Sequence, residues 1–268
     1  MAMARFPVAH ATHPQWAMAV SLVVAQLESQ LHAWHAQHTQ HALQASHAQP
    51  STPKLGLVYF TDHLAAHAEA MHQALASALP EVSSWVGTVA HGVLADEAEY
   101  WDEPALAVML CDVPESEFAV FSGVSPLPSH FDAHTALVHA DPEMTELGDN
   151  VRELAARMAS GAVFGALSTS RARVVQVAHQ PGQDMCESVL EGGLSGVAFT
   201  HHVAVHSRIT HGCKPIGRER VVTEASRHLL LALDGEPALA LLLNDLRVSL
   251  DQPREALLAV RGTRLAIN

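Results

Sequence analysis

The segment "LVYFTD", from Leu57 to Asp62, decides the expected fold because it predicts a short apolar strand that runs directly into a helix. Its last residue, an aspartate, is suited to cap that helix. The residues that follow repeat apolar side chains at helical spacing, at Leu64, Met71, Leu75 and Leu79. A strand followed by an amphipathic helix is typical of proteins that combine sheets with helices packed on them.

The same pattern recurs about eighty residues later in the chain. The segment "LVHAD" (Leu137 to Asp141) has the same form, and Pro142 follows at a position suited to the first residue of a helix. The expected apolar face of this second helix is Met144, Leu147, Val151, Leu154 and Met158. After each helix the sequence predicts a strand with a central glycine, Gly87 in "WVGTVA" and Gly165 in "VFGALST".

Two more strands are expected in each copy, and we expect them to pair with each other. They are "PALAVML" with "EFAVFS" in the first copy and "GLSGVAF" with "HVAVHSRI" in the second. The repeated unit is therefore strand, helix, strand, strand, strand. The predicted fold class is α/β of the α+β type, with largely antiparallel or mixed sheets and helices on one face of each.

Three regions are expected along the chain. Residues 1–50 form an N-terminal helical segment with one helix over residues 15–45, and residues 51–207 hold the two copies. Residues 208–268 begin a further domain with a strand pair, a turn at Asp234-Gly235 and a helix that starts at Pro237. The chain ends soon afterwards, so we expect this last domain to be incomplete.

The composition argues against several classes of partner. The net charge of -13 over 268 residues disfavours nucleic acid and anionic membrane surfaces, which need a broad basic face. No apolar run reaches the ~20 residues of a membrane helix. The three cysteines form no C-x-x-C pair, which favours a reducing, cytoplasmic location.

Histidines are frequent but do not predict a metal site. His32, His35, His38 and His41 are three residues apart, and on a helix this spacing spreads the rings around the circumference. No Walker A sequence, nucleophile elbow or His-Glu-x-x-His occurs. We therefore expect no metal, no cofactor and no recognisable catalytic constellation.

The candidate ligand site is a locally basic segment in an acidic chain. Residues 208–268 carry nine Lys and Arg against seven acids, whereas residues 1–207 carry six against twenty-one. Glycines and arginines together suit a small carboxylate or phosphate; alternatively, these arginines pair with the acidic first part across a domain seam. The candidate residues in this segment are Arg208, Gly212, Cys213, Lys214, Pro215, Gly217 and Arg218.

Three roles stay open for the Cys213 thiol: a nucleophile activated by its basic neighbours, a ligand contact, or a small side chain in a tight turn. A second glycine pair, Gly192 and Gly193 in "LEGGLSGVAF", lacks the following helix of a dinucleotide site. It predicts a strand edge that another backbone or a ligand approaches closely, and we include both glycines in the candidate site.

The segment "THGCKPIGRERVVTEASRHLLLALDGEPAL" resembles the junction between the two parts of the FIST domain, an intracellular sensory module of bacteria. The segments "LGLVYFTDHLAAHAEAM", "SSWVGTVAHGV" and "EYWDEPALAVML" resemble its N-terminal part. By this resemblance, residues 51–207 are FIST N-like and residues 208–268 begin a truncated FIST C-like part. Two segments, "VAHGVL" and "ALSTSRARVV", carry fewer glycines than the family pattern.

The resemblance implies a signal-transduction domain that senses a small ligand. We therefore expect a cytoplasmic protein that binds a small anionic metabolite, such as an amino acid or another carboxylate, with a signalling protein as its further partner. Two alternatives stay open. One is a scaffold that binds a protein and no small ligand, and the other is a cysteine-dependent enzyme.

Overall fold

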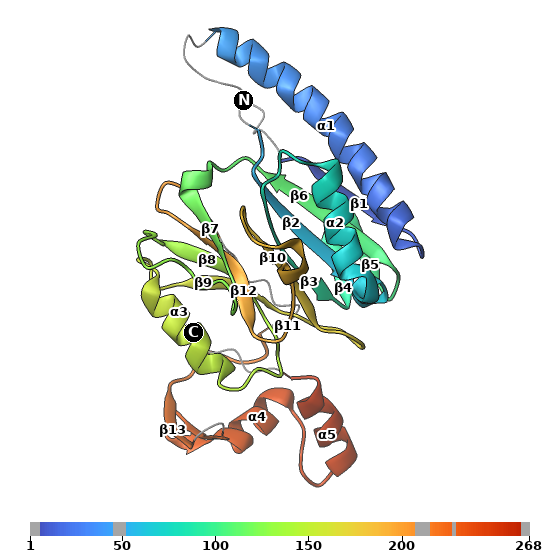
Figure 1. Cartoon of the computed structure of the whole chain (residues 1–268). Coiled ribbons are helices and arrows are strands. Elements are labelled where there is room, and N and C mark those ends of the chain that lie inside the picture. Colours follow the sequence, from blue (N-terminus) through green and yellow to red (C-terminus); the bar gives the residue numbers. More distant parts are fainter. Residues whose placement is uncertain (1–5, 45–51, 207–214, 227–228, 264–268) are drawn as a thin grey trace. The chain divides into compact units, whose positions relative to one another are not determined.

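The computed structural model describes residues 6–44, 52–206, 215–226 and 229–263, with side chains described outside 35–44. The chain divides into two compact units, residues 1–207 (the first unit) and 208–268 (the second unit). Figure 1 shows the elements of both. The mixed α/β fold class is confirmed.

One mixed sheet of the first unit has the strand order β1-β6-β2-β3-β10-β11. Only β2 and β3 are parallel; the other neighbours in this sheet are antiparallel. Its strands are β1 (Val8–Thr12), β2 (Leu55–Thr61), β3 (Ser84–Ala90), β6 (Ala105–Cys111), β10 (Val175–His179) and β11 (Val189–Glu191). A short hairpin, β4 (Gly92–Ala95) with β5 (Ala98–Trp101), follows β3.

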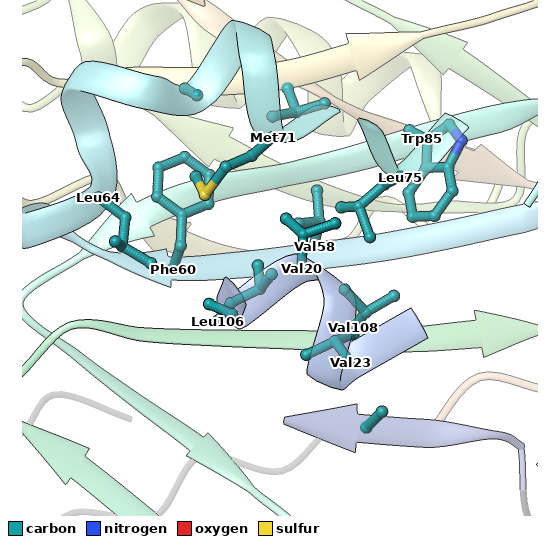
Figure 2. Packing of buried hydrophobic residues seen from close by; sticks show 14 of the residues in the cluster. Val20, Val23, Val58, Phe60, Leu64, Met71, Leu75, Trp85, Leu106 and Val108 are labelled. Carbon is teal, nitrogen blue, oxygen red and sulfur yellow. The ribbon is translucent and has the colours of Figure 1, made fainter. Parts of the chain in front are cut away.

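Helices α1 (Trp16–Gln44) and α2 (Ala68–Ala78) lie on one face of this sheet (Figure 1), and a 3-10 helix, η1 (Asp62–His67), precedes α2. Figure 2 shows the core that they form with it. Val20 and Val23 of α1 and Met71 and Leu75 of α2 are buried in one cluster with Val58 of β2. The predicted apolar face of α2 is thus confirmed. None of the described helices is long and apolar enough to cross a membrane.

A second sheet of the first unit has the order β7-β12-β8-β9. Its strands are β7 (Phe118–Phe121), β8 (Thr135–Ala140), β9 (Val163–Leu167) and β12 (Leu194–Phe199), and the remaining elements of the unit are α3 (Leu147–Arg157), η2 (Glu115–Glu117) and η3 (Met185–Glu187). Leu154 of α3 packs with Val138 of β8 in one buried cluster. Another cluster joins Val86 of β3 to Val197 of β12 and fills the space between the sheets. Each sheet thus carries its helices on one face, as predicted.

The strands β1-β6-β2-β3 and β7-β12-β8-β9 are arranged in the same way, each with a parallel pair at one end. In these pairs Val58 lies opposite Gly87 and Val138 lies opposite Gly165. A Cβ on Gly87 would come within 1.7 Å of the Val58 carbonyl oxygen, and one on Gly165 within 1.8 Å of the Val138 carbonyl oxygen. Close backbone approach therefore explains both central glycines; the duplication itself stays a prediction.

The predicted strand pairings within each copy were wrong. The strand "PALAVML" is β6 and "EFAVFS" is β7, but they belong to different sheets. In the second copy, β12 pairs with β7 and β8, and residues 202–206 of "HVAVHSRI" form no strand. Strand β1 and the β10–β11 pair were not expected, because alternation within one short segment does not reveal a partner far away in the chain.

The predicted starts of the two helices also need correction. Asp62 does not cap a helix: Thr61 occupies the N-cap position, and the Asp62 carboxylate is bound by Arg171. The second helix begins at Leu147 rather than at Pro142. The backbone after Pro142 turns first, because the carboxylate of Asp141 accepts a hydrogen bond from the N–H group two residues on, at 2.8 Å.

The second unit follows its predicted order. It contains β13 (Val222–Ser226), β14 (Leu229–Leu233), β15 (Glu236–Pro237), α4 (Ala238–Leu246) and α5 (Pro253–Arg261). Asp234 and Gly235 have φ values of 50° and 83°, a left-handed turn that suits these two residue types. The expected Asp-Gly turn and the helix after Pro237 are therefore confirmed.

A buried histidine gives the first unit a predictable dependence on acid. His72 of α2 is 2% exposed, its ring faces those of Trp85 and His179, and neither of its nitrogens has a hydrogen-bond partner among the described residues. Burial lowers its pKa to about 4, and the nearby His179 contributes. The unfolded chain therefore takes up this proton at higher pH than the folded chain does, and stability falls as pH drops from about 6.5 to about 4.

We expect His72→Leu to reduce this acid-induced loss of unfolding free energy by roughly 3 kcal/mol between pH 7 and pH 4. Urea unfolding at a series of pH values measures it. His32→Leu is the control, because His32 is exposed on α1. Equal pH slopes for His72→Leu and the unmodified protein would show that His72 is not buried in its neutral form.

Candidate functional site

Four of the predicted ligand-binding residues, Arg208, Gly212, Cys213 and Lys214, lie outside the described residues. Pro215, which follows them, is exposed. The three roles considered for the Cys213 thiol therefore stay predictions.

Arg218, which belongs to the predicted set, and its neighbour Arg220 are both paired within the second unit. Arg218 Nη2 lies 3.3 Å from Asp234 Oδ2, and Arg220 donates two hydrogen bonds to Asp245, at 2.6 and 2.9 Å. Gly217 lies against the second pair, since a Cβ there would come within 2.4 Å of Asp245 Oδ2. These arginines thus pair with acidic residues in the turn and helix of their own unit. The alternative considered above was pairing with the acidic first part of the chain.

Gly192 and Gly193 form the turn between β11 and β12, with φ values of 76° and 71°. The carbonyl oxygen of Gly193 accepts hydrogen bonds from the Asp141 N–H group at 2.9 Å and from Gln176 Nε2 at 3.1 Å. Gln176 is buried and its oxygen accepts a further bond from Ser195 Oγ at 2.6 Å. The backbone of Asp141 thus approaches Gly193, and the positive φ values account for both glycines. Their role in binding a ligand stays a prediction.

A charged cluster not expected from the sequence lies at the carboxyl end of β2. The Asp62 side chain there is 3% exposed. Arg171, in the segment after β9, donates to both Asp62 carboxylate oxygens, from Nε at 2.7 Å and from Nη2 at 2.8 Å, and its backbone N–H group donates at 2.9 Å. These hydrogen bonds hold the pKa of Asp62 well below its usual range. Asp62 is therefore ionised at neutral pH and fixes the guanidinium in place.

A hollow of about 220 Å³ adjoins this ion pair and is lined by His91, Trp101, Asp102 and Arg171; we call it the Arg171 hollow. The Trp101 side chain is 68% exposed, and Asp102 accepts a hydrogen bond from Arg171 Nη1. His91 Nε2 is buried, lies 3.9 Å from Asp62 Oδ2 and has no hydrogen-bond partner among the described residues. The volume is below the ~300 Å³ of a site for a drug-sized molecule, so it suits a smaller one.

The segment that carries Arg171 is tied to both sheets. It leaves the second sheet at the end of β9, and Ser168 Oγ accepts a buried hydrogen bond of 2.6 Å from Thr88 in the first sheet. Arg173 donates to Glu69 of α2 and to Glu191 of β11, both at 2.7 Å. A molecule held by Arg171 therefore contacts a segment through which the two sheets are linked.

One signal in the sequence could have indicated this cluster. Residues 1–207 contain six Lys and Arg, and two of them, Arg171 and Arg173, stand two residues apart. Ligand sites of α/β sheets form at the carboxyl ends of parallel strands, which is where Asp62 follows β2. The spacing of more than a hundred residues between Asp62 and Arg171 gave no indication that the two meet.

A second hollow, also of about 220 Å³, lies between α1 and the end of α2. Its lining is mainly apolar and includes Leu31, Leu79, Val82 and Leu110, with carboxylates at Glu28 and Glu81. No Lys or Arg is part of its described lining. It is therefore less suited to an anion than the Arg171 hollow.

The two described cysteines are poor nucleophiles. Burial raises the pKa of the Cys111 thiol to about 12. A hydrogen bond with Asp184 raises the pKa of Cys186. Since the thiolate is the reactive form, the raised pKa values disfavour nucleophilic chemistry at these two thiols near neutral pH.

A protein-family model described as "FIST N domain" matches residues 54–236. Two proteins of Mycobacterium tuberculosis are each 29% identical over 170 residues: "Uncharacterized protein MT0656" of strain CDC 1551 / Oshkosh and "Uncharacterized protein Rv0628c" of strain ATCC 25618 / H37Rv. Each alignment covers 59% of this chain and 43% of the relative, so the match spans less than half the length of each relative. No solved structure matches the chain.

Proposed function

The chain belongs to the FIST N domain family, and on this premise we propose that it senses a small carboxylate, such as an organic acid or an amino acid, in the Arg171 hollow. FIST domains are generally sensory domains of signal transduction. The interpretation of residues 208–268 as the start of a FIST C-like part stays a prediction. We also propose a cytoplasmic location, which the absence of a paired cysteine framework in the sequence supports.

The observation that carries the proposal is that one partner of an ion pair is buried and the other is exposed. Asp62 is buried, whereas the Arg171 side chain that it anchors is 54% exposed and borders the hollow. An anchored guanidinium can bind a carboxylate without losing side-chain freedom, which lowers the entropic cost of binding. Trp101 supplies an exposed apolar face beside it.

The same geometry offers a route for the signal. Arg171 lies in the segment that links the two sheets through Thr88 and Ser168. A ligand that binds one arrangement of this segment better than another shifts the population between them. The read-out would then be a change in packing within the first unit.

A thermal-shift screen with amino acids and organic acids tests the proposal. A ligand that binds only the folded state, at a concentration about 100 times its Kd, raises the free energy of unfolding by ~2.7 kcal/mol. This corresponds to an increase of several degrees in Tm. Trp101→Ala should diminish this increase. Leu94→Ala is the matched control, because Leu94 is 77% exposed on the same hairpin and does not line the hollow. An increase that Trp101→Ala leaves unchanged would contradict the proposed location.

The basic segment predicted from the sequence remains the other proposed location. If the ligand binds there, Arg218→Ala lowers the ligand-induced shift and Trp101→Ala does not. Loss of a catalytic activity in Cys213→Ser, with ligand binding retained, would instead favour a thiol enzyme.

A second candidate function, binding of a signalling protein, is favoured by the apolar surface of the second unit. Val221, Leu229, Leu250 and Leu258 are each at least 60% exposed. Such exposed apolar side chains mark a protein interface where they gather into one patch. If a protein partner is recovered by pull-down, Leu229→Ser with Leu258→Ser should abolish its recovery and leave the carboxylate-induced Tm shift intact.

A further inference from the structure

The two carboxylates bound to Arg171 differ in how firmly they are held. Asp62 is buried and binds through both oxygens, with an additional backbone N–H bond. Asp102 binds only Nη1 and its side chain is 63% exposed. Exposed ion pairs contribute only about 0–1 kcal/mol, so the Asp102 contact can be exchanged at small cost.

The backbone around Asp102 also permits exchange. Asp102 follows the last residue of β5 and has a φ of 58°, so it lies in an exposed turn outside the strand. Its carboxylate appears in no described hydrogen bond other than that with Arg171. Movement of this side chain into solvent would therefore break one contact and leave the described core unchanged.

The charges of the hollow show what Asp102 does while it is bound. Arg171 brings one positive charge and faces two carboxylates, Asp62 and Asp102. His63 Nδ1 and His91 Nε2 lie 3.4 and 3.9 Å from Asp62 oxygens. With Asp102 in place, Arg171 and the two carboxylates together carry one negative charge, which opposes the entry of another anion.

We propose that Asp102 is an internal competitor for the ligand: its carboxylate occupies Arg171 Nη1 in the free protein and is displaced by the carboxylate of the ligand. This inference rests on the proposed function, and it specifies the ligand as a monocarboxylate. The ligand's apolar or flat group lies on the exposed Trp101 ring, next to Asp102 in the chain. His91 borders the same hollow beside Asp62, with Nε2 3.9 Å from Asp62 Oδ2.

The test uses three molecules of nearly equal shape: phenylacetate, its neutral amide phenylacetamide, and the cation phenethylamine. Their affinities are measured by titrating the full chain and following the indole N–H signal of Trp101 by NMR, assigned through Trp101→Phe. The variant is Asp102→Asn. Asp149→Asn is the matched control, because Asp149 also pairs with an arginine, Arg152, and is 69% exposed.

We expect Asp102→Asn to bind phenylacetate about three- to tenfold more tightly than the unmodified chain, since it removes both a competitor and a repulsive charge. Phenylacetamide should bind weakly, and its affinity should differ little between Asp102→Asn and the unmodified chain. Asp149→Asn, with the same change in net charge, should bind as the unmodified chain does.

Unchanged or weaker phenylacetate binding in Asp102→Asn, with clear binding to the unmodified chain, would overturn the competitor role and leave the proposed function intact. If the unmodified chain prefers phenethylamine and Asp102→Asn loses this preference, Asp102 recognises a cation. This result would also overturn the competitor role. If neither chain binds any carboxylate, the proposed function itself fails.

Discussion

Gly87→Ala is expected to destabilise the first unit by about 4 kcal/mol or more, a loss in the range found only when a backbone or core position is disrupted. The added Cβ would lie 1.7 Å from the Val58 carbonyl oxygen, and backbone in a paired strand cannot move aside as a side chain can. The strands β2 and β3 would have to separate at the centre of their pairing, where Val58 lies opposite Gly87. Urea unfolding followed by tryptophan fluorescence measures the loss.

Gly123→Ala is the control for this substitution, because no described atom lies within 4 Å of a Cβ at that position. It should change the free energy of unfolding by less than about 1 kcal/mol. A similarly small effect of Gly87→Ala would show that β2 and β3 do not pair in this register.

Arg171→Ala is the second substitution with a large expected effect, a loss of about 3 kcal/mol of unfolding free energy. It leaves the carboxylate of Asp62, now 3% exposed, without the two side-chain hydrogen bonds that satisfy it. Removal of one partner from a buried pair is costly because the remaining charge is left desolvated. Urea unfolding at pH 7 measures this loss.

Arg173→Ala is the matched control, since Arg173 also binds two carboxylates but both are about half exposed or more, at 49% for Glu69 and 61% for Glu191. Arg173→Ala should lower the free energy of unfolding by only about 1 kcal/mol. The Asp62–Arg171 pair also has a defined pH dependence: because the pKa of Asp62 is lowered in the fold, its contribution is complete above about pH 4 and declines as pH falls further. Equal losses in the two variants would contradict the special role of Asp62.

Much of the fold was predictable because its signals are local. The strand at Leu57, the apolar face of α2 and the Asp234-Gly235 turn each depend on residues within a few positions of one another. Strand pairing was not predictable in this way. β6 and β7 follow one another in the chain yet join different sheets, and β1 finds its partner β6 almost a hundred residues away.

The candidate site shows the same division between local and distant information. The basic segment around Arg218 stood out by local charge, and the structure shows Arg218 and Arg220 paired inside their own unit. The sequence singled out Asp62 because it ends a predicted strand, and this position was interpreted as a helix cap. Only the fold brings Arg171 to it from the segment after β9, and only this meeting creates the hollow.

The central claim is that a small carboxylate binds Arg171 within the hollow beside Trp101. The most direct measurement is an NMR titration of the isotope-labelled chain with phenylacetate, following the Nε–H of Arg171 and the indole N–H of Trp101. We predict saturable shifts of both signals with one dissociation constant. Absence of any shift at these two groups, or shifts confined to the apolar hollow at Leu31 and Leu79, would contradict the claim.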